Sequence, residues 1–286
     1  MNAGEPNTAS VDPVTATAAP DALGVSRCRD EPCNKLRSKL IRQMTQASKT
    51  FDMLAPDDRV MVCLSGGKDS WVLLDLLGKL VARLPFSVDL IAVNLDQGHP
   101  GFQQHVIAEY CEQTGVRFEP VMQDTYSVVL EKVPEGRTQC SLCSRMRRGI
   151  LYRTAERLGC TKIALGHHRD DILETALLNL FYGGKLATMP PRLQSDDGRN
   201  VVIRPLALCA EQDVATYAAH VGFPILPCDL CGSQENLHRQ QMKSLLSELS
   251  ANNPRVPGNM LAALGNVNPS HLLDLPLQAS LEKARE

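Results

Sequence analysis

The sequence predicts an α/β protein built on a doubly wound parallel sheet, with an N-terminal helix and a small C-terminal helical appendage. Short β-branched apolar runs alternate with helix-length amphipathic segments, as in a parallel sheet with crossover helices. A glycine-rich turn at residues 65–70 joins the first apolar run to such a helix. Polar residues follow the later apolar runs, where the carboxyl ends of parallel strands gather around one ligand.

The chain has 286 residues, which suits one large domain, expected here over residues 28–275. Residues 1–27 are rich in Ala, Thr, Pro, Asp and Ser and predict a disordered tail, and residues 276–286 predict a flexible C-terminus. The tail lacks the basic start and apolar core of a secretory signal. The formal net charge of −2 excludes a polycation, so any nucleic-acid surface must be local. No run approaches the ~18 apolar residues of a membrane helix.

The first predicted helix, residues 33–51, carries five cations and no acidic residue. Its apolar stripe, the buried side of an amphipathic helix, comprises Leu36, Leu40, Ile41 and Met44. The cations have two interpretations, a solvated helix face or a contact with an RNA backbone. They are Lys35, Arg37, Lys39, Arg42 and Lys49.

Residues 65–70, the phosphate loop, follow a buried strand at 59–64 and precede a helix that includes 71–77. Gly66 and Gly67 are expected to take positive φ and let the backbone approach a ligand. The helix N-terminus, Lys68 and the hydroxyls of Ser65 and Ser70 suit a phosphate or pyrophosphate. Lys68 is followed by Asp69, so this is not a Walker A loop. The alternative is an ordinary glycine-rich turn.

A second strand is expected at 88–95, ending at Asp96, and then a helix at 101–114 and a strand at 116–122. Ligands of open parallel sheets lie beyond the carboxyl ends of the strands. Asp96 is therefore expected near the nucleotide.

The first cysteine pair, Cys140 and Cys143, opens into a basic helix that reaches Leu158. Six arginines and one glutamate lie between Arg137 and Arg157. Such a helix is a candidate anchor for RNA phosphates, and the alternative is a set of surface arginines.

A fourth strand at 161–165 ends in Gly166, His167, His168, Arg169, Asp170 and Asp171, before a helix at 172–182. Adjacent carboxylates beside a phosphate site suit Mg²⁺. The alternative is helix capping. We expect one aspartate to cap and one to face the metal, without assigning which. For His167 and His168, a role in the nucleotide pocket is favoured over zinc binding.

Residues 183–200 predict a loop or hairpin, followed by a strand at 201–203 and a helix at 211–221. The second cysteine pair is Cys228 and Cys231, and a helix at 234–249 comes after it. Two such pairs indicate a metal site but leave its metal open. Four thiolates would close a zinc site, and three would leave one position open on an iron–sulfur cluster.

The phosphate loop resembles that of the N-type ATP pyrophosphatases, which implies a Rossmann-like PP-loop fold. Taken together, the motifs between residues 33 and 275 resemble the tRNA 2-thiocytidine synthetase family. The segments that carry the resemblance are Ser65–Ser70, Cys140–Cys143, Leu165–Ile172, Phe181–Gly184, Pro227–Ser233 and Gly265–Leu272.

The resemblance implies a cytoplasmic, dimeric enzyme that replaces O2 of cytidine 32 in tRNA with sulfur after adenylation by ATP and Mg²⁺. It implies a [4Fe–4S] cluster on Cys140, Cys143 and Cys228, with sulfur from a cysteine desulfurase. Cys231 matches a cysteine that is not a ligand, with a persulfide or supporting role.

By the same resemblance, Lys68, Asp69 and Cys231 are candidate catalytic residues. Asp170 or Asp171 would bind magnesium. The nucleotide would contact residues 65–70, Asp96, Gly166, His167 and Asp171. Two alternatives stay open, a related tRNA uridine 2-thiolase and a zinc-binding RNA-binding protein with an inactive nucleotide fold.

Overall fold

The computed structural model describes residues 30–132, 140–226 and 234–283. The predicted tail and both cysteines of the second pair lie outside these ranges. Six strands form one sheet in the order β3-β2-β1-β4-β6-β5. The strands are β1 (Asp58–Cys63), β2 (Val88–Asp96), β3 (Phe118–Met122), β4 (Lys162–Ala164), β5 (Arg192–Gln194) and β6 (Val201–Ile203).

The strands β1, β2, β3, β4 and β6 run parallel, as the alternation of strands and helices predicts. In the centre of the sheet, Val60 is paired with Leu90 of β2 and with Lys162 of β4. The edge strand β5 instead runs antiparallel to β6. A short connection forces this direction, because parallel neighbours need a long crossover. The predicted hairpin within residues 183–200 is thereby confirmed, and the sheet is mixed at one edge.

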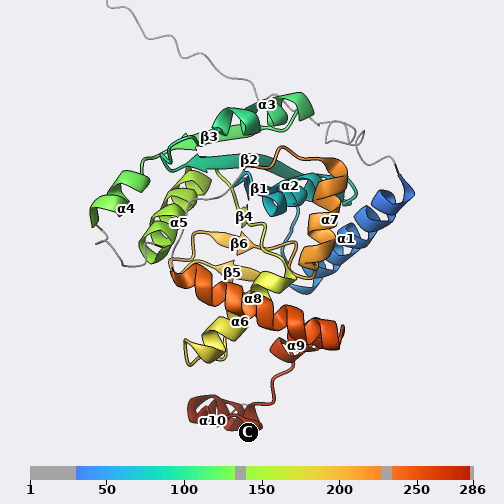
Figure 1. The fold of residues 1–286 in the computed structure, drawn as a ribbon, viewed down its shortest axis with the longest axis vertical. Coiled ribbons are helices and arrows are strands. Elements are labelled where there is room, and N and C mark those ends of the chain that lie inside the picture. Colours follow the sequence, from blue (N-terminus) through green and yellow to red (C-terminus); the bar gives the residue numbers. More distant parts are fainter. Residues whose placement is uncertain (1–29, 133–139, 227–233, 284–286) are drawn as a thin grey trace, which may run out of the picture.

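One face of the sheet is covered by α1 (Glu31–Thr50), α2 (Lys68–Val81), α3 (Gln104–Thr114) and α7 (Glu211–Val221) (Figure 1). Trp71 lies at the centre of this layer and is fully buried. Its ring stacks on Phe223 at 6.2 Å between centroids and tilts against Tyr110 at 4.6 Å. These contacts join α2, α3 and the end of α7 into one core.

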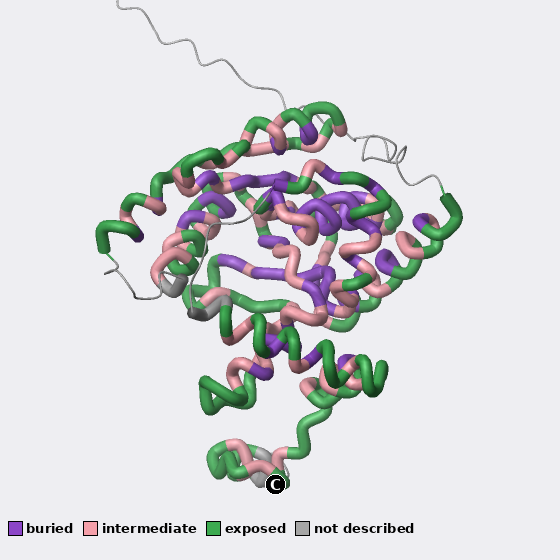
Figure 2. Tube along the Cα trace, in the orientation of Figure 1, coloured by how far each residue is buried: buried purple, intermediate pink, exposed green. Residues whose placement is uncertain are grey.

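The opposite face of the sheet packs against α5 (Cys140–Arg157), beside which lies α4 (Tyr126–Lys132). Ala155 of α5 is buried with Met61, Ile91 and Ile163 of the sheet. Since helices cover both faces, the predicted doubly wound arrangement is confirmed. Figure 2 shows the consequence, central strands that are buried between the two helix layers, whereas the edge strand β5 is exposed.

Several helix ends differ from the prediction because of capping. α1 begins at Glu31, since the Asp30 carboxylate accepts a 2.8 Å hydrogen bond from the N–H of Cys33. The helix predicted at 172–182 is α6 (Arg169–Phe181), which starts three residues earlier behind the N-cap residue His168.

The C-terminal part of the chain forms the predicted helical appendage (Figure 1). It comprises α8 (Gln234–Asn252), α9 (Val256–Leu264), a 3-10 turn η1 (Pro269–His271) and α10 (Leu275–Lys283). A helix therefore occupies most of the segment for which the sequence favours a flexible end. None of the helices among the described residues is both long and apolar enough to cross a membrane.

Candidate active site

The phosphate loop connects β1 to α2, as predicted. Gly66 takes φ +84°, whereas Gly67 is extended at φ −76° and ψ 159°. The expectation of positive φ is right for Gly66 and wrong for Gly67. Gly67 is the N-cap residue of α2 and has no side chain to occupy the first N–H groups of the helix, which suits an anion at that position.

The two loop hydroxyls brace the loop. Ser70 Oγ donates a 2.9 Å hydrogen bond to the carbonyl of Gly67 and accepts one of 3.2 Å from the N–H of Ser65. Ser65 Oγ accepts a 3.3 Å hydrogen bond from the N–H of Gly67. The backbone is thus held in shape by the same side chains that the sequence suggests as phosphate ligands.

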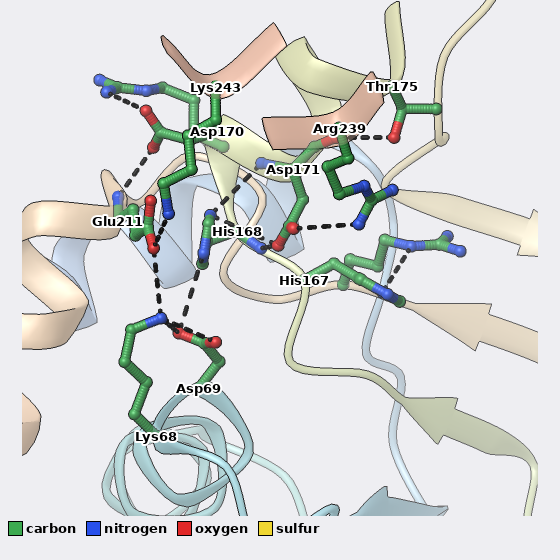
Figure 3. A network of polar contacts seen from close by, with 12 residues as sticks. Lys68, Asp69, His167, His168, Asp170, Asp171, Thr175, Glu211, Arg239 and Lys243 are labelled. Atoms are coloured by element: carbon green, nitrogen blue, oxygen red, sulfur yellow. Dashed lines mark hydrogen bonds and ion pairs between the residues drawn. The ribbon is translucent and has the colours of Figure 1, made fainter. Parts of the chain in front are cut away.

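Lys68 is held between two carboxylates. Its Nζ lies 3.1 Å from both carboxylate oxygens of Asp69 and 3.4 Å from Oε1 of Glu211 (Figure 3). Burial alone would lower the pKa of Lys68, but Asp69 and Glu211 outweigh it and raise this pKa. The lysine therefore carries a full positive charge at the start of α2.

Gly166 brings the end of β4 against the phosphate loop. A Cβ atom at this position would lie 3.0 Å from the carbonyl carbon of Asp69 and 3.0 Å from the nitrogen of Ser70. Any side chain would push these two backbones apart, so glycine is needed for their close approach. Gly166 thereby sets the position of the phosphate loop, and its contact with a nucleotide stays a prediction.

Asp170 and Asp171, which follow β4, each cap the start of a helix. Asp171 Oδ2 accepts a 3.0 Å hydrogen bond from the N–H of His168, which forms a capping box at the start of α6. Asp170 Oδ2 accepts a 2.7 Å hydrogen bond from the N–H of Glu211, at the start of α7. From the sequence, only one of the two is expected to cap, with the other facing a metal ion.

Magnesium has no assembled protein site among the described residues. No group of three or more His, Cys, Asp or Glu side chains is arranged there to hold a metal ion. The carboxylates of Asp69, Asp170 and Asp171 are nevertheless oxygen donors of the kind that Mg²⁺ takes, together with phosphate oxygens. Each of them makes contact with a cation, respectively Lys68, Arg169 and Arg239.

The two histidines face different partners (Figure 3). His168 is 4% exposed, and its Nε2 lies 3.8 Å from Oδ1 of Asp69. His167 Nδ1 accepts a 3.3 Å hydrogen bond from Nε of Arg204. Burial, and then the charge of Arg204, lowers the pKa of His167 to about 4. His167 is therefore neutral near pH 7, with a fixed acceptor nitrogen.

Asp96 shapes the loop after β2. The side chain is 9% exposed, and its Oδ1 accepts a 2.9 Å hydrogen bond from the N–H of Gly98, which takes φ +81°. Asp96 thus lies at the carboxyl edge of the sheet, as predicted, where it holds the turn that carries Gln97.

The first cysteine pair lies at the same edge as the phosphate loop. Cys143 Sγ is 3.4 Å from Oε1 of Gln97, which follows β2, and 3.7 Å from a guanidinium nitrogen of Arg147. Cys140 is the first residue of α5 and precedes Cys143 by three residues. A thiolate donor with a cation beside it suits a metal–sulfur site.

The second cysteine pair lies outside the described residues, but the chain leading to it is anchored at the phosphate loop. Leu226 donates a 2.9 Å backbone hydrogen bond to the carbonyl of Gly66. A Cβ on Gly66 would lie 2.9 Å from Cδ1 of Leu226, so this side chain covers the loop. Cys228 follows two residues later in the sequence.

The structure adds site residues that the sequence analysis missed. Glu211 comes from α7, and Arg239 and Lys243 come from α8. Lys243 Nζ lies 2.7 Å from Oε1 of Glu211. Glu174 of α6 is 4% exposed, and burial, then the charge of Asp171, raises its pKa to about 7. The sequence offers one signal for these residues, since Glu174 lies one helical turn beyond Asp170 and Asp171.

Comparison with known proteins places this geometry in a family. Residues 36–242 match the model of the PP-loop domain. The chain is 60% identical over 241 residues to a tRNA-cytidine(32) 2-sulfurtransferase of Aeromonas hydrophila, covering 84% of this chain and 80% of that protein. It is 55% identical over 283 residues to the protein of that name from Burkholderia lata, covering 97% and 86%.

Among solved structures, the chain resembles the U34-tRNA thiolase NcsA from Methanococcus maripaludis with its [4Fe–4S] cluster, at a TM-score of 0.62. The identity is 24%, and the match covers 80% of this chain and 79% of the thiolase. This likeness supports the fold. By the matched domain and the identity to its curated relatives, the chain is a transferase that belongs to the PP-loop family and, within it, to the tRNA-cytidine(32) 2-sulfurtransferases.

Proposed function

We propose that the protein converts cytidine 32 of the tRNA anticodon loop to 2-thiocytidine, with ATP as the activating substrate. One observation carries the proposal: the phosphate loop and Cys143 lie at the same carboxyl edge of the sheet. Lys68 stands at the start of α2, and Cys143 contacts the residue that follows β2. A nucleotide site and a sulfur-binding site are thereby brought to one substrate.

ATP would serve to make O2 of the cytidine a leaving group. This oxygen attacks the α-phosphorus, the bond from that phosphorus to pyrophosphate breaks, and an adenylated base results. Lys68 and the first N–H groups of α2 stabilise the charge that develops on the phosphates. His168, buried between Asp69 and Asp171, keeps the two motifs in a fixed relation.

Sulfur would then replace the adenylated oxygen. A sulfur atom at the oxidation level of sulfide bonds to C2, the C2–O2 bond breaks, and AMP leaves with the oxygen. A cysteine desulfurase with a thiol reductant would supply sulfur of this kind. Cys231 is proposed to support the site or to accept sulfane sulfur from the desulfurase as a persulfide, from which the thiol reductant, itself oxidised to a disulfide, releases sulfur at the level of sulfide. Lys68 and Asp69 are proposed as the other catalytic residues.

An iron–sulfur cluster fits the residues that could hold it. Cys140 and Cys143 are three residues apart in α5, and the chain before Cys228 is fixed at Gly66. When bound by these three thiolates, a [4Fe–4S] cluster would supply one iron without a protein ligand, a soft site that binds sulfide. Mg²⁺ would be held by Asp170 or Asp171 together with the phosphates and would neutralise their charge.

The RNA contact proposed for α5 has support in its exposed cations. Arg145, Arg147 and Arg148 are exposed at the helix end that carries Cys143, whereas Arg157 at the other end is paired with Glu119 at 2.7 Å. Cations at the cysteine end suit the phosphates of a loop whose base enters the site.

A cytoplasmic homodimer completes the proposal. Large apolar side chains are exposed at the end of α6 and just beyond it, which suits contact with a second copy. They are Leu180 at 51%, Phe181 at 56%, Tyr182 at 53% and Leu186 at 64% exposure.

The experiment is a thiolation assay on an unmodified tRNA transcript with ATP, Mg²⁺ and sulfide, using anaerobically purified protein. Nucleoside mass spectrometry should detect 2-thiocytidine, and it should be absent when ATP is omitted or position 32 is uridine. Lys68→Ala should give no product. Absence of thiolated cytidine from the complete reaction, with iron bound, would overturn the proposal.

A uridine 2-thiolase is the second candidate, because one solved structure with the same fold is named as a U34-tRNA thiolase. The same digest separates the two, since the thiolated nucleoside would be a uridine. A zinc-binding RNA-binding protein with an inactive nucleotide fold would give neither product, and metal analysis would find zinc.

A further inference from the structure

A groove with three basic residues lies along one side of α1, next to its buried face. It encloses about 640 Å³ and is lined by two rows of residues spaced four apart, closed by Arg83 beyond the end of α2. The lining residues are Ser38, Ile41, Arg42, Thr45, Gln46, Lys49, Thr50 and Arg83. Of the described residues that line it, three are cations and none is acidic.

The cations of this groove differ from the others on the same helix. Lys35 pairs with Glu31 at 2.6 Å, Lys39 pairs with Asp213 at 2.6 Å, and Arg37 donates a 2.7 Å hydrogen bond to Asn34. Arg42 and Lys49 form no such contact with any described residue. The uncompensated charge of α1 is therefore concentrated on the groove side.

Arg83 adds a third cation from a different element. Its side chain is exposed and likewise makes no ion pair within the described part of the chain. Lys49 lies in the last turn of α1, where the helix dipole favours a cation. That explanation does not extend to Arg42, which lies in the middle of the helix, or to Arg83. Like charges gathered in one groove repel one another unless an anion lies between them.

Three of the five neutral groove residues can donate hydrogen bonds to a ligand, whereas Ile41 is apolar and the Thr45 hydroxyl donates to the carbonyl of Ile41. Ser38, Gln46 and Thr50 are exposed and carry hydroxyl or amide groups. Such groups, together with arginine and lysine, are those that contact the phosphates and sugars of nucleic acids.

The groove lies well away from the phosphate loop. Lys68 and Arg83 are separated by 15 residues, which corresponds to ~22 Å along the axis of α2. A nucleotide in the active site cannot reach this far, but a structured RNA carries phosphate charge along its whole length.

We infer that the groove binds the phosphate backbone of the tRNA substrate at a second contact, away from the base that reacts. This inference rests on the proposed RNA substrate. The second contact would fix the position of the stem while the anticodon loop enters the site. It carries no sequence information, so it would act on every tRNA alike.

The test compares two triple variants of the full-length protein. R42Q/K49Q/R83Q removes the groove cations, and K35Q/R37Q/K39Q removes the same charge from partnered positions on α1. Binding of a fluorescent tRNA transcript is followed by anisotropy over a range of salt concentrations. The affinity of each variant for ATP is measured beside it as a check on the active site.

The groove variant should bind tRNA at least tenfold more weakly near 0.1 M salt. The slope of log affinity against log salt should be shallower by about 2 to 3, and by less than 1 in the control. Unchanged tRNA affinity in the groove variant overturns the inference. An acidic protein would then be the remaining candidate partner of the groove. An equal loss of tRNA affinity in both variants also overturns the inference, because the affinity would then depend on the total positive charge of α1 and not on the groove. If the unaltered protein itself binds no tRNA, the proposed function fails with it.

Discussion

The carboxylate of Asp170 accepts a 2.7 Å hydrogen bond from the N–H of Glu211, the first residue of α7. Glu211 in turn contacts Lys68 at 3.4 Å. Asp170 thus positions a carboxylate that holds the lysine of the phosphate loop. The segment that follows β4 therefore acts on the phosphate loop through the N-terminus of α7.

Asp170→Ala should lower the free energy of unfolding by about 1–2 kcal/mol, because it removes the acceptor from a helix start. Asp170→Asn keeps an acceptor oxygen, so its free energy of unfolding should fall by less than that of Asp170→Ala. Urea unfolding monitored by circular dichroism measures both, with Asp196→Ala on the exposed hairpin as control. Equal stability of Asp170→Ala and the unaltered protein would contradict this capping role.

Lys68→Ala should reduce the rate of tRNA adenylation by roughly a hundredfold or more, because it removes a charge aimed at the developing phosphate charge. Lys243→Ala is the matched control, since Lys243 also contacts Glu211 but has a 54% exposed side chain. Pyrophosphate release with saturating tRNA measures the rate. Adenylation kinetics that do not change in Lys68→Ala would count against the phosphate-loop assignment.

The raised pKa of Glu174 predicts that the stability of the protein depends on pH. Burial raises its pKa from 4.5 in the unfolded chain to about 7 in the folded protein. Between these values the unfolded chain loses the proton while the folded protein keeps it, so the contribution of Glu174 to stability falls as pH rises from 4.5 to 7. The basic neighbours Arg239 and Lys243 partly offset this loss.

Glu174→Gln mimics the protonated carboxyl, so its stability should match the unaltered protein at pH 4.5 and exceed it by up to about 3 kcal/mol above pH 7. Urea unfolding at several pH values gives the difference, and the exposed Glu248→Gln is the control. A difference that stays constant with pH would show that Glu174 ionises normally.

A buried polar contact joins α2 to α7. Tyr217 donates a 2.7 Å hydrogen bond to Asp75, which also pairs with Lys79. Asp75→Ala should destabilise the protein by about 3–5 kcal/mol, because it leaves a buried cation without its carboxylate. Tyr217→Phe should cost about 1–2 kcal/mol.

Tyr182→Phe is the matched control for Tyr217→Phe, since Tyr182 is 53% exposed, and it should change stability by less than about 0.5 kcal/mol. Thermal unfolding compares all three variants. The KM for ATP should stay the same in Tyr217→Phe, because this contact lies outside the site. A large rise in KM would assign it a functional role.

Cys143→Ala should remove iron and acid-labile sulfide from anaerobically purified protein, together with the visible charge-transfer absorption of a cluster. Cys228→Ala should do the same. Cys160 is a half-buried free thiol outside both pairs, so Cys160→Ala should keep the full iron content. Iron retained in Cys143→Ala, or zinc in the unaltered protein, would contradict the cluster.

The strands and the phosphate loop could be predicted because their signals are local. A β-branched run, a glycine turn and an amphipathic run give β1, the loop and α2 directly. The sequence predicts α6 only from residue 172, because a histidine N-cap such as His168 is an unusual helix start.

The remaining site residues could not be found this way. Glu211 lies 143 residues from Lys68, and no pattern in α7 distinguishes it from an ordinary helix start. The capping of α7 by Asp170 could not be predicted either, because the capped residue, Glu211, lies 41 residues away and leaves no pattern near Asp170 in the sequence. These contacts form only because α7 and α8 pack beside the phosphate loop and α6 in the folded protein.

The hydrogen bond between Leu226 and Gly66 has a thermodynamic consequence. It connects the nucleotide loop to the chain that continues toward Cys228, so a nucleotide that shifts Gly66 would also displace Leu226. Coupling between two binding sites is reciprocal. If Cys228 binds the proposed cluster, any factor by which ATP alters the affinity for that cluster must equal the factor by which the cluster alters the affinity for ATP.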